Sequence, residues 1–571
     1  MYDVIGVDSK KPIVIALTIV LFTGAMPALG IDGSTDSVVF LLDDSSITSF
    51  ESGMLDRIDG MTAWTYDEAL EGISVSHRAF RSAGSAGANA TSTWIEGMFS
   101  GFGLETWTEP FEFATWDLLG RPELTVDIDG DVATNSDRTS LESFQSEHFS
   151  WPTPDGGFLA EAVVLPLPSV PDRASMGSAA IDDEDWAGLN TTDKIVFVGR
   201  EVRWNGDWGQ KFFQKIAVET PVAVVFIWWY DWMNGFPPAY YPSTGGRPLG
   251  TMANTFWSLG VSTGSVNFTE SMLIKSALPD NDASAFISIP SSIALGSHRN
   301  VIGRLQGHAA PERMILVTGH YDTVMDPGFC DNGAGVAGVL EIANMTAEAM
   351  SEDLYRPKYT ILFVAFAAEE LGMVGSVNFV KAHLAELKNI VAVLNIDCIG
   401  SDELKVTMTE SSSGLDMDEI VLDAAEDLGV VASIEGPGGS DQESFRDPIG
   451  SEGTYSHNWD KAASISGARP VMASAMVSSS PIIYSDIWTL GTPGWIHTSH
   501  DSSFSIGGTA WIDEQNLEDH IRVSALTLLR LSPDVRENGD DDSAIAYLIV
   551  GVVLAVAVLA VTAVIFFGRR Q

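Results

Sequence analysis

In the C-terminal half of the chain, short apolar runs alternate with longer segments of helical periodicity. The runs 314–319, 359–367 and 390–396 are rich in Val, Ile, Leu and Phe, which is typical of strands buried on both faces. Segments 332–350 and 375–386 place apolar residues at helical spacing. This alternation predicts an α/β fold in which a mostly parallel mixed sheet is flanked by helices.

The pattern changes in residues 121–297, where strand-like runs such as 195–199 and 222–230 are interrupted by Gly and Pro. We interpret this region as a β-rich domain inserted into the α/β domain, which then comprises 64–120 and 298–531.

Both ends of the chain carry apolar runs with charged flanks. Two lysines, an apolar run and small residues give 1–30 the layout of a signal peptide, with an uncleaved anchor as the alternative, and a polar segment, 31–63, follows. The 24 residues 544–567 have no charge and as a helix would extend about 36 Å, enough to span a bilayer. An acidic stalk, 532–543, precedes this run and two arginines follow it. The positive-inside rule therefore predicts a cytoplasmic tail, 568–571, and a single-pass cell-membrane protein with the bulk of the chain on the extracellular side.

Composition excludes two classes of protein and one source of stability. The chain has 571 residues and a net charge of −46, so a nucleic-acid partner bound through its phosphates is excluded. Hydrophobic residues make up 45% of the chain, which excludes disorder over most of its length. The two cysteines, Cys330 and Cys398, are too few for a disulfide framework.

Residue types that bind metal ions follow each of the three apolar runs. Because parallel strands end at the same edge of a sheet, these side chains are expected to meet there. Imidazoles and carboxylates around two cations make a hydrolytic two-metal site of the kind zinc accepts. Carboxylates crowded at the ends of apolar strands would be costly without cations. The residues are His320 and Asp322, then Asp331, Glu369 and Glu370, Asp397, and finally His497 with His500.

The roles within this group can be partly separated. Asp322 lies two residues after His320 on a strand and is expected to accept the ring N–H of that histidine. Adjacent Glu369 and Glu370 cannot do the same work, so one is expected to bind metal and the other to take a proton from water.

These residues lie in motifs that resemble a known family. GHYDTV, DNGAGVAGVLEIA, FVAFAAEELGMVGS, LNIDCIG and HTSHDS are similar to the signatures of the co-catalytic di-zinc exopeptidases, which include leucyl aminopeptidases, glutamate carboxypeptidase II and the non-peptidase transferrin receptor. Within the insert, residues 191–229 resemble a protease-associated (PA) domain. The resemblance implies a catalytic domain that holds two Zn(II) ions.

Carried over position by position, the resemblance implies a role for each residue. Asp331 would bridge both zinc ions, His320 and Asp397 would complete one site, and Glu370 and His497 the other. Glu369 matches the general base that activates the metal-bridging water, and Asp322 the acid that orients histidine. His497 is preferred to His500 because, with Asp501, it matches the family's HTxxD spacing. Three candidates for the group that stabilises the oxyanion stay open: Tyr455, His457 and Tyr484.

The function expected from the resemblance is aminopeptidase hydrolysis of peptides. A carboxypeptidase of the same family and a catalytically inactive receptor or binding module are the alternatives, and glutaminyl cyclase chemistry is a third. Cys330 and Cys398 each adjoin an expected ligand and are interpreted as small buried residues, with an extra ligand or a bracing disulfide as alternatives. The oligomeric state, side-chain specificity and role of the insert stay open.

Overall fold

The computed structural model describes residues 46–536, with gaps at 78–79, 128–137, 148–149, 172–174, 176–180, 182–185, 204–205, 231–259, 279–282, 402, 408–416, 436–439, 447–472, 479–500 and 504–511. Within these ranges, no helix has both the length and the apolar character needed to cross a membrane. The predicted signal peptide and the predicted span 544–567 lie outside the described residues.

The first sheet has eight strands in the order β1-β10-β12-β11-β13-β16-β14-β15. Its centre is parallel, since β11 pairs in parallel with both β12 and β13, and β13 pairs in parallel with β16. Strands β1 and β10 add an antiparallel pair at one edge. The strands are β1 (Glu105–Leu118), β10 (Ser291–Leu305), β11 (Ala310–His320), β12 (Tyr359–Phe366), β13 (Ile390–Ile396), β14 (Leu404–Thr407), β15 (Ala432–Glu435) and β16 (Ala473–Ser478).

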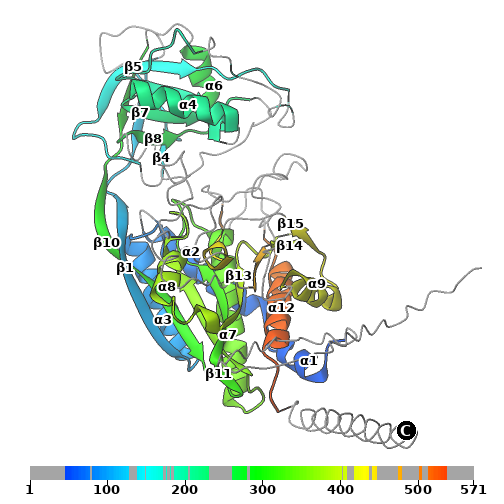
Figure 1. Ribbon diagram of the computed structural model, residues 1–571. Helices are drawn as coiled ribbons and strands as arrows, with labels where there is room; N and C mark the ends of the chain where they lie inside the picture. Colours follow the sequence, from blue (N-terminus) through cyan, green and yellow to red (C-terminus); the bar gives the residue numbers. More distant parts are fainter. Residues whose placement is uncertain are drawn as a thin grey trace, which may run out of the picture. The chain divides into compact units, whose positions relative to one another are not determined.

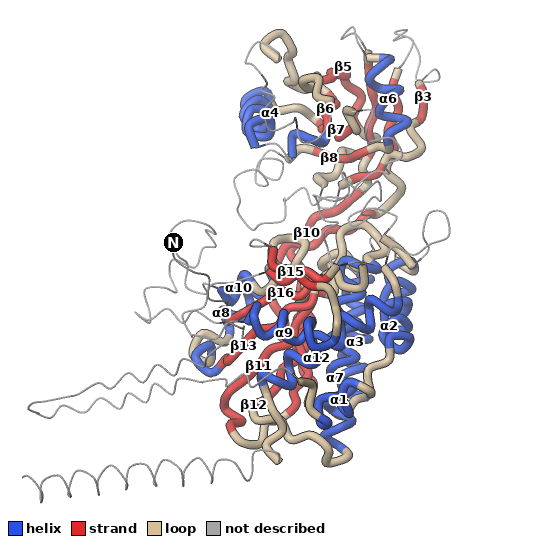
Figure 2. The backbone as a smooth tube through the Cα atoms, turned by 90° about the vertical axis from the view of Figure 1, so that its right-hand side faces the viewer, coloured by secondary structure: helices blue, strands red, loops and turns tan. Residues whose placement is uncertain are grey.

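Helices cover both faces of this sheet, as Figure 2 shows with α2, α3 and α7 on one side of the strands and α8 on the other. Alternate strand residues therefore join different cores: Val317 and Phe363 pack in the core beneath α7, whereas Leu316 packs with α8. The mixed α/β fold predicted from the apolar runs is confirmed. The helices are α1 (Ser49–Leu55), α2 (Gly60–Val75), α3 (Ala86–Gly101), α7 (Gly335–Ser351), α8 (Val374–Ala382), α9 (Met417–Leu428), α10 (Glu443–Arg446) and α12 (Glu514–Leu531).

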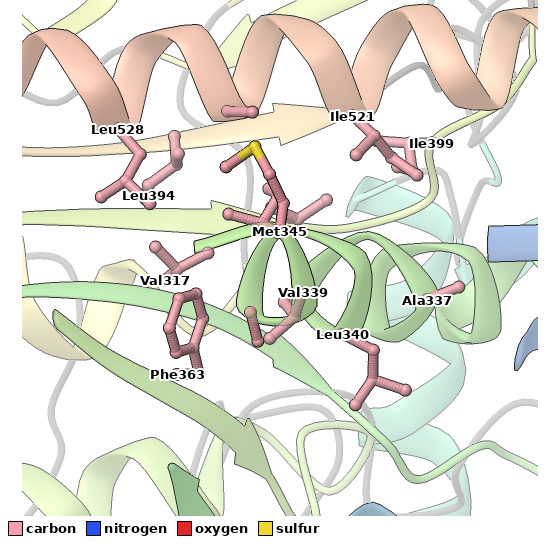
Figure 3. Packing of buried hydrophobic residues seen from close by; sticks show 14 of the residues in the cluster. Val317, Ala337, Val339, Leu340, Met345, Phe363, Leu394, Ile399, Ile521 and Leu528 are labelled. Atoms are coloured by element: carbon pink, nitrogen blue, oxygen red, sulfur yellow. The ribbon is translucent and has the colours of Figure 1, made fainter. Parts of the chain in front are cut away.

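Helix α7 lies at the centre of the larger core. It packs on β11 and β12 and also contacts α12, and Figure 3 shows Val339 and Met345 of α7 among Val317, Phe363 and Leu394. Burial on nearly all sides explains why the α7 sequence is apolar around most of its circumference. This packing fixes the start of α7, where the chain arrives from the loop that carries Asp331.

A second sheet contains the strands between Glu123 and Ser288, in the order β3-β2-β9-β5-β6-β7-β8-β4. Figure 1 labels β4, β5, β7 and β8 of this sheet. Strands β5 to β8 pair in parallel, and the predicted strand 195–199 is β6. The helices of this region are α4 (Gly206–Glu219) and α6 (Phe268–Ala277). The strands are β2 (Glu123–Val126), β3 (Thr139–Ser140), β4 (Gln145–Ser146), β5 (Phe158–Leu165), β6 (Ile195–Gly199), β7 (Ala223–Ile227), β8 (Ser262–Ser265) and β9 (Ser284–Ser288).

Candidate metal centre

Three adjacent parallel strands of the first sheet end at one edge. His320 is the last residue of β11 and pairs in register with Phe366, the last residue of β12. Thr318 of β11 pairs with Asn395, so β13 also ends at this level, and Asp397 follows it directly. The register thus places the predicted metal-binding types together, as expected from the carboxyl ends of parallel strands.

His320, Asp331 and Asp397 converge at this edge. One ligand atom from each lies within 4.8 Å of the others. His320 Nε2 is 3.3 Å from Asp331 Oδ1 and 3.6 Å from Asp397 Oδ1, and all three residues are buried. Sequence reasoning had assigned these three residues as metal ligands, and the fold brings them together from β11, from the loop before α7 and from the end of β13.

The charge balance of this group favours a cation. Burial alone would lower the pKa of His320, but the charge of Asp397 and the contacts to Asp322 and Asp331 raise that pKa well above its ordinary value. Asp397 Oδ1 is buried and accepts no hydrogen bond from any residue that the structure describes. One imidazole nitrogen facing two carboxylates is a donor set that zinc accepts, so the residues fit a metal ion.

The ring of His320 is held by Asp322 in a different way from the one expected. Nδ1 lies 3.0 Å from the backbone carbonyl oxygen of Asp322 but 3.7 Å from its Oδ1. Because a carbonyl only accepts, Nδ1 carries the hydrogen and Nε2 is directed at the two carboxylates. The Asp322 carboxylate instead accepts the backbone N–H groups of Glu369, at 3.0 Å, and Glu370, at 3.3 Å. Asp322 therefore connects β11 to the segment after β12.

The two glutamates differ in accessibility. Glu370 is buried, whereas Glu369 is partly accessible and its carboxylate accepts no hydrogen bond from the residues that the structure describes. Burial and the neighbouring Glu370 raise the pKa of Glu369 well above its ordinary value, against the opposing charge of His320. A carboxylate with free acceptor oxygens and a raised pKa has the properties that a general base needs.

Asn332 is a buried residue that sequence reasoning did not single out. Its Nδ2 donates to the carbonyl oxygen of Ile396 (3.0 Å), and its Oδ1 accepts the N–H groups of Gly335 (3.0 Å) and Cys398 (3.1 Å). This amide thus connects the loop of Asp331 to the chain on both sides of Asp397. Its place between Asp331 and Gly333 in the DNG motif was the available signal.

Asp441 is a second residue that sequence reasoning left without a role. It is fully buried and accepts a hydrogen bond from the Ser376 hydroxyl at 2.5 Å. Burial raises its pKa to about 7, against the opposing charge of His320. The acidic residues of the segment GGSDQESF (438–445) were the available signal for a functional role. The sequence does not show that this segment contacts the start of α8.

Several predicted residues lie outside the described residues: His497, His500 and the three candidates Tyr455, His457 and Tyr484. The two cysteines are described. Both are buried free thiols, their side chains hydrogen-bond to each other, and neither belongs to the convergent group of described ligands. Burial raises the pKa of Cys330 to about 12, so this thiol stays neutral at physiological pH.

Solved structures of bacterial peptidases share this fold. A zinc aminopeptidase from Bacillus subtilis matches with a TM-score of 0.55 and 18% identity over 83% of this chain and 95% of its own. A peptidase M28 precursor from Shewanella amazonensis matches with a TM-score of 0.58 and 17% identity, over 84% and 96% of the two chains. At these identities the likeness shows the fold alone.

Sequence comparison finds relatives that match a limited part of this chain. The match to a glutamate carboxypeptidase 2 homolog of Caenorhabditis briggsae is 33% identical and covers 24% of this chain and 18% of that protein. Aminopeptidase NAALADL1 of Mus musculus is 31% identical over 19% of this chain and 15% of its own length. The matched part is thus less than a fifth of either relative. Residues 300–506, which contain every predicted metal ligand, match the model described as peptidase family M28.

Proposed function

We propose that this chain is a membrane-anchored, outward-facing zinc metallopeptidase that removes N-terminal residues from peptides. The observation that carries the proposal is the convergence of His320, Asp331 and Asp397 at the edge where Glu369 and Glu370 follow β12. The match of residues 300–506 to peptidase family M28 and the relatives that are named zinc metalloprotease and aminopeptidase support it. The uncharged run 544–567 supports the anchor, and the PA-like interpretation of 121–297 belongs to the same proposal.

In this proposal the chain holds two zinc ions. His320, Asp331 and Asp397 would bind the first, and Asp331, Glu370 and His497 would bind the second. Bound zinc ions supply Lewis-acid polarisation of the scissile carbonyl and make water more acidic. Glu369 accepts the proton of the attacking water and returns it to the leaving amine. Asp322 and Asn332 keep the ligand-bearing segments in place.

The first prediction concerns which end of a peptide is recognised. A tetra-alanine peptide with free ends and its C-terminal amide are expected to release alanine at comparable rates, because an aminopeptidase needs only a free N-terminal amine. The N-acetylated peptide is expected to release none. Amino-acid analysis over time, with the purified full-length chain, measures all three.

The reverse pattern, release from the acetylated peptide but not from the amide, would contradict the aminopeptidase assignment and favour a carboxypeptidase. The match to glutamate carboxypeptidase 2 homologs gives that outcome a specific basis. Release from none of the three peptides would favour a binding module on this fold.

A further inference from the structure

The segment that carries Asp331 is not a regular α-helix. It forms an irregular turn, η4 (Phe329–Ala334), in which Asp331 (φ −107°, ψ 95°) and Asn332 (φ −124°, ψ 49°) have non-helical backbone angles. Its amide groups must therefore find partners elsewhere, because the segment is buried. Those partners decide where the Asp331 carboxylate lies.

Asp501 supplies the partners for consecutive amides of this segment. Its Oδ1 accepts the N–H of Cys330 at 2.7 Å, and its Oδ2 accepts the N–H of Asp331 at 3.0 Å. Its backbone carbonyl oxygen accepts the N–H of Phe329 at 3.2 Å. Asp501 is fully buried, so water cannot replace these bonds without rearrangement.

Arg81 contacts backbone carbonyl groups just before this segment, whereas Asp501 contacts backbone N–H groups within it. Its guanidinium donates to the carbonyl oxygens of Pro327 and Gly328, both at 2.8 Å, and it is also fully buried. A carboxylate thus takes the N–H groups and a guanidinium takes the carbonyl groups of adjacent residues. Because Arg81 and Asp501 both contact backbone atoms, they fix the position of the backbone before Asp331 independently of the side chains of this segment.

We propose that Asp501 is a positioning residue for the metal centre, which sets the zinc affinity of the chain by fixing the backbone of Asp331. Asp501 is not part of the convergent group of ligands among the described residues, and both of its oxygens already accept backbone N–H groups. Contacts that orient a metal ligand typically change metal affinity about 10- to 100-fold. The proposal rests on the zinc centre of the proposed function but not on the kind of peptide that is cleaved.

The test compares zinc affinity between variants of the full-length chain. Asp501→Asn keeps the shape of the side chain but turns one acceptor into an N–H₂ group that faces a backbone N–H. We expect the zinc dissociation constant, measured by competition with a chromophoric chelator, to rise about 10- to 100-fold. Thermal unfolding of the metal-free protein, followed by circular dichroism, is measured on the same samples.

Asp534→Asn is the matched control. Asp534 is a buried aspartate that also accepts backbone N–H groups, from Arg356 at 3.0 Å and Arg536 at 3.3 Å, but none of these residues is a predicted ligand. We expect this variant to lower the metal-free unfolding temperature without a change in zinc affinity. A general loss of stability would change zinc affinity to the same extent in both variants. A positioning role of Asp501 would lower zinc affinity only in Asp501→Asn.

Equal zinc affinity in the unmodified chain and Asp501→Asn, or an equal loss in Asp534→Asn, would overturn the assignment while leaving the proposed function intact. An unmodified chain that binds no zinc would overturn the proposed function and this assignment together. If Asp501→Asn does not fold, Asp501→Glu replaces it: the charge and both acceptors stay, but the added methylene displaces the segment. For Asp501→Glu we expect the zinc dissociation constant to rise at least about threefold. An unchanged zinc dissociation constant would refute the proposal.

Discussion

Glu369→Gln is expected to lower peptide turnover about 100- to 10,000-fold while zinc binding stays close to that of the unmodified chain. The amide is nearly isosteric with the carboxylate but cannot accept a proton. Because the Glu369 carboxylate makes no hydrogen bond to the described residues, its replacement leaves no buried partner unsatisfied. Steady-state kinetics should therefore show a fall in kcat with little change in KM.

Glu386→Gln provides the control for this prediction. Glu386 is an exposed glutamate that contacts His383 at 3.0 Å, away from the ligand-bearing strand ends. Its substitution is expected to leave turnover unchanged. Near-normal turnover in Glu369→Gln would show that another group accepts the proton.

Arg81→Met is expected to lower the free energy of unfolding by about 3–5 kcal/mol, the largest effect on stability that we predict. The guanidinium donates to Ser74 Oγ (2.7 Å) and to the carbonyl of Tyr321 (3.0 Å), in addition to those of Pro327 and Gly328. Its charge also opposes the rise that burial causes in the pKa of Asp67. Without Arg81, buried carbonyl groups lose their donor and the buried carboxylate of Asp67 loses a cationic neighbour.

Urea denaturation, followed by tryptophan fluorescence, measures this effect. Arg57→Met is the comparison, because Arg57 is partly exposed and pairs with Glu348 and Glu352, both of which are more exposed still. Surface pairs of this kind contribute about 0–1 kcal/mol. Similar losses in the two variants would contradict the role assigned to Arg81.

The sequence predicted those parts of the fold in which both faces of an element are buried. The runs 314–319, 359–367 and 390–396 correspond to β11, β12 and β13, because a strand covered by helices on both sides needs continuous apolar residues. His320 and Asp397 could be placed beside each other for the same reason, since parallel neighbouring strands end together. Strand order in the remainder of the sheet has no comparable signal.

The contacts that hold the site in place could not be predicted. Asp501 and Cys330 are 171 residues apart, and Arg81 and Pro327 are 246 apart, so neither pair belongs to a common periodic pattern. The Asp322 carboxylate shows the same difficulty on a smaller scale. Its spacing from His320 favoured a contact to the ring, but the turn after β12 presents two backbone N–H groups to it instead.

The most direct test of the zinc peptidase account is the metal content of the purified full-length chain, measured by mass spectrometry before and after chelation, with alanine release assayed on each sample. The account predicts about two zinc ions per chain, loss of peptide cleavage when they are removed, and its return when zinc is added back. A folded chain with no stoichiometric metal, or one that cleaves peptides equally well without it, would contradict the account.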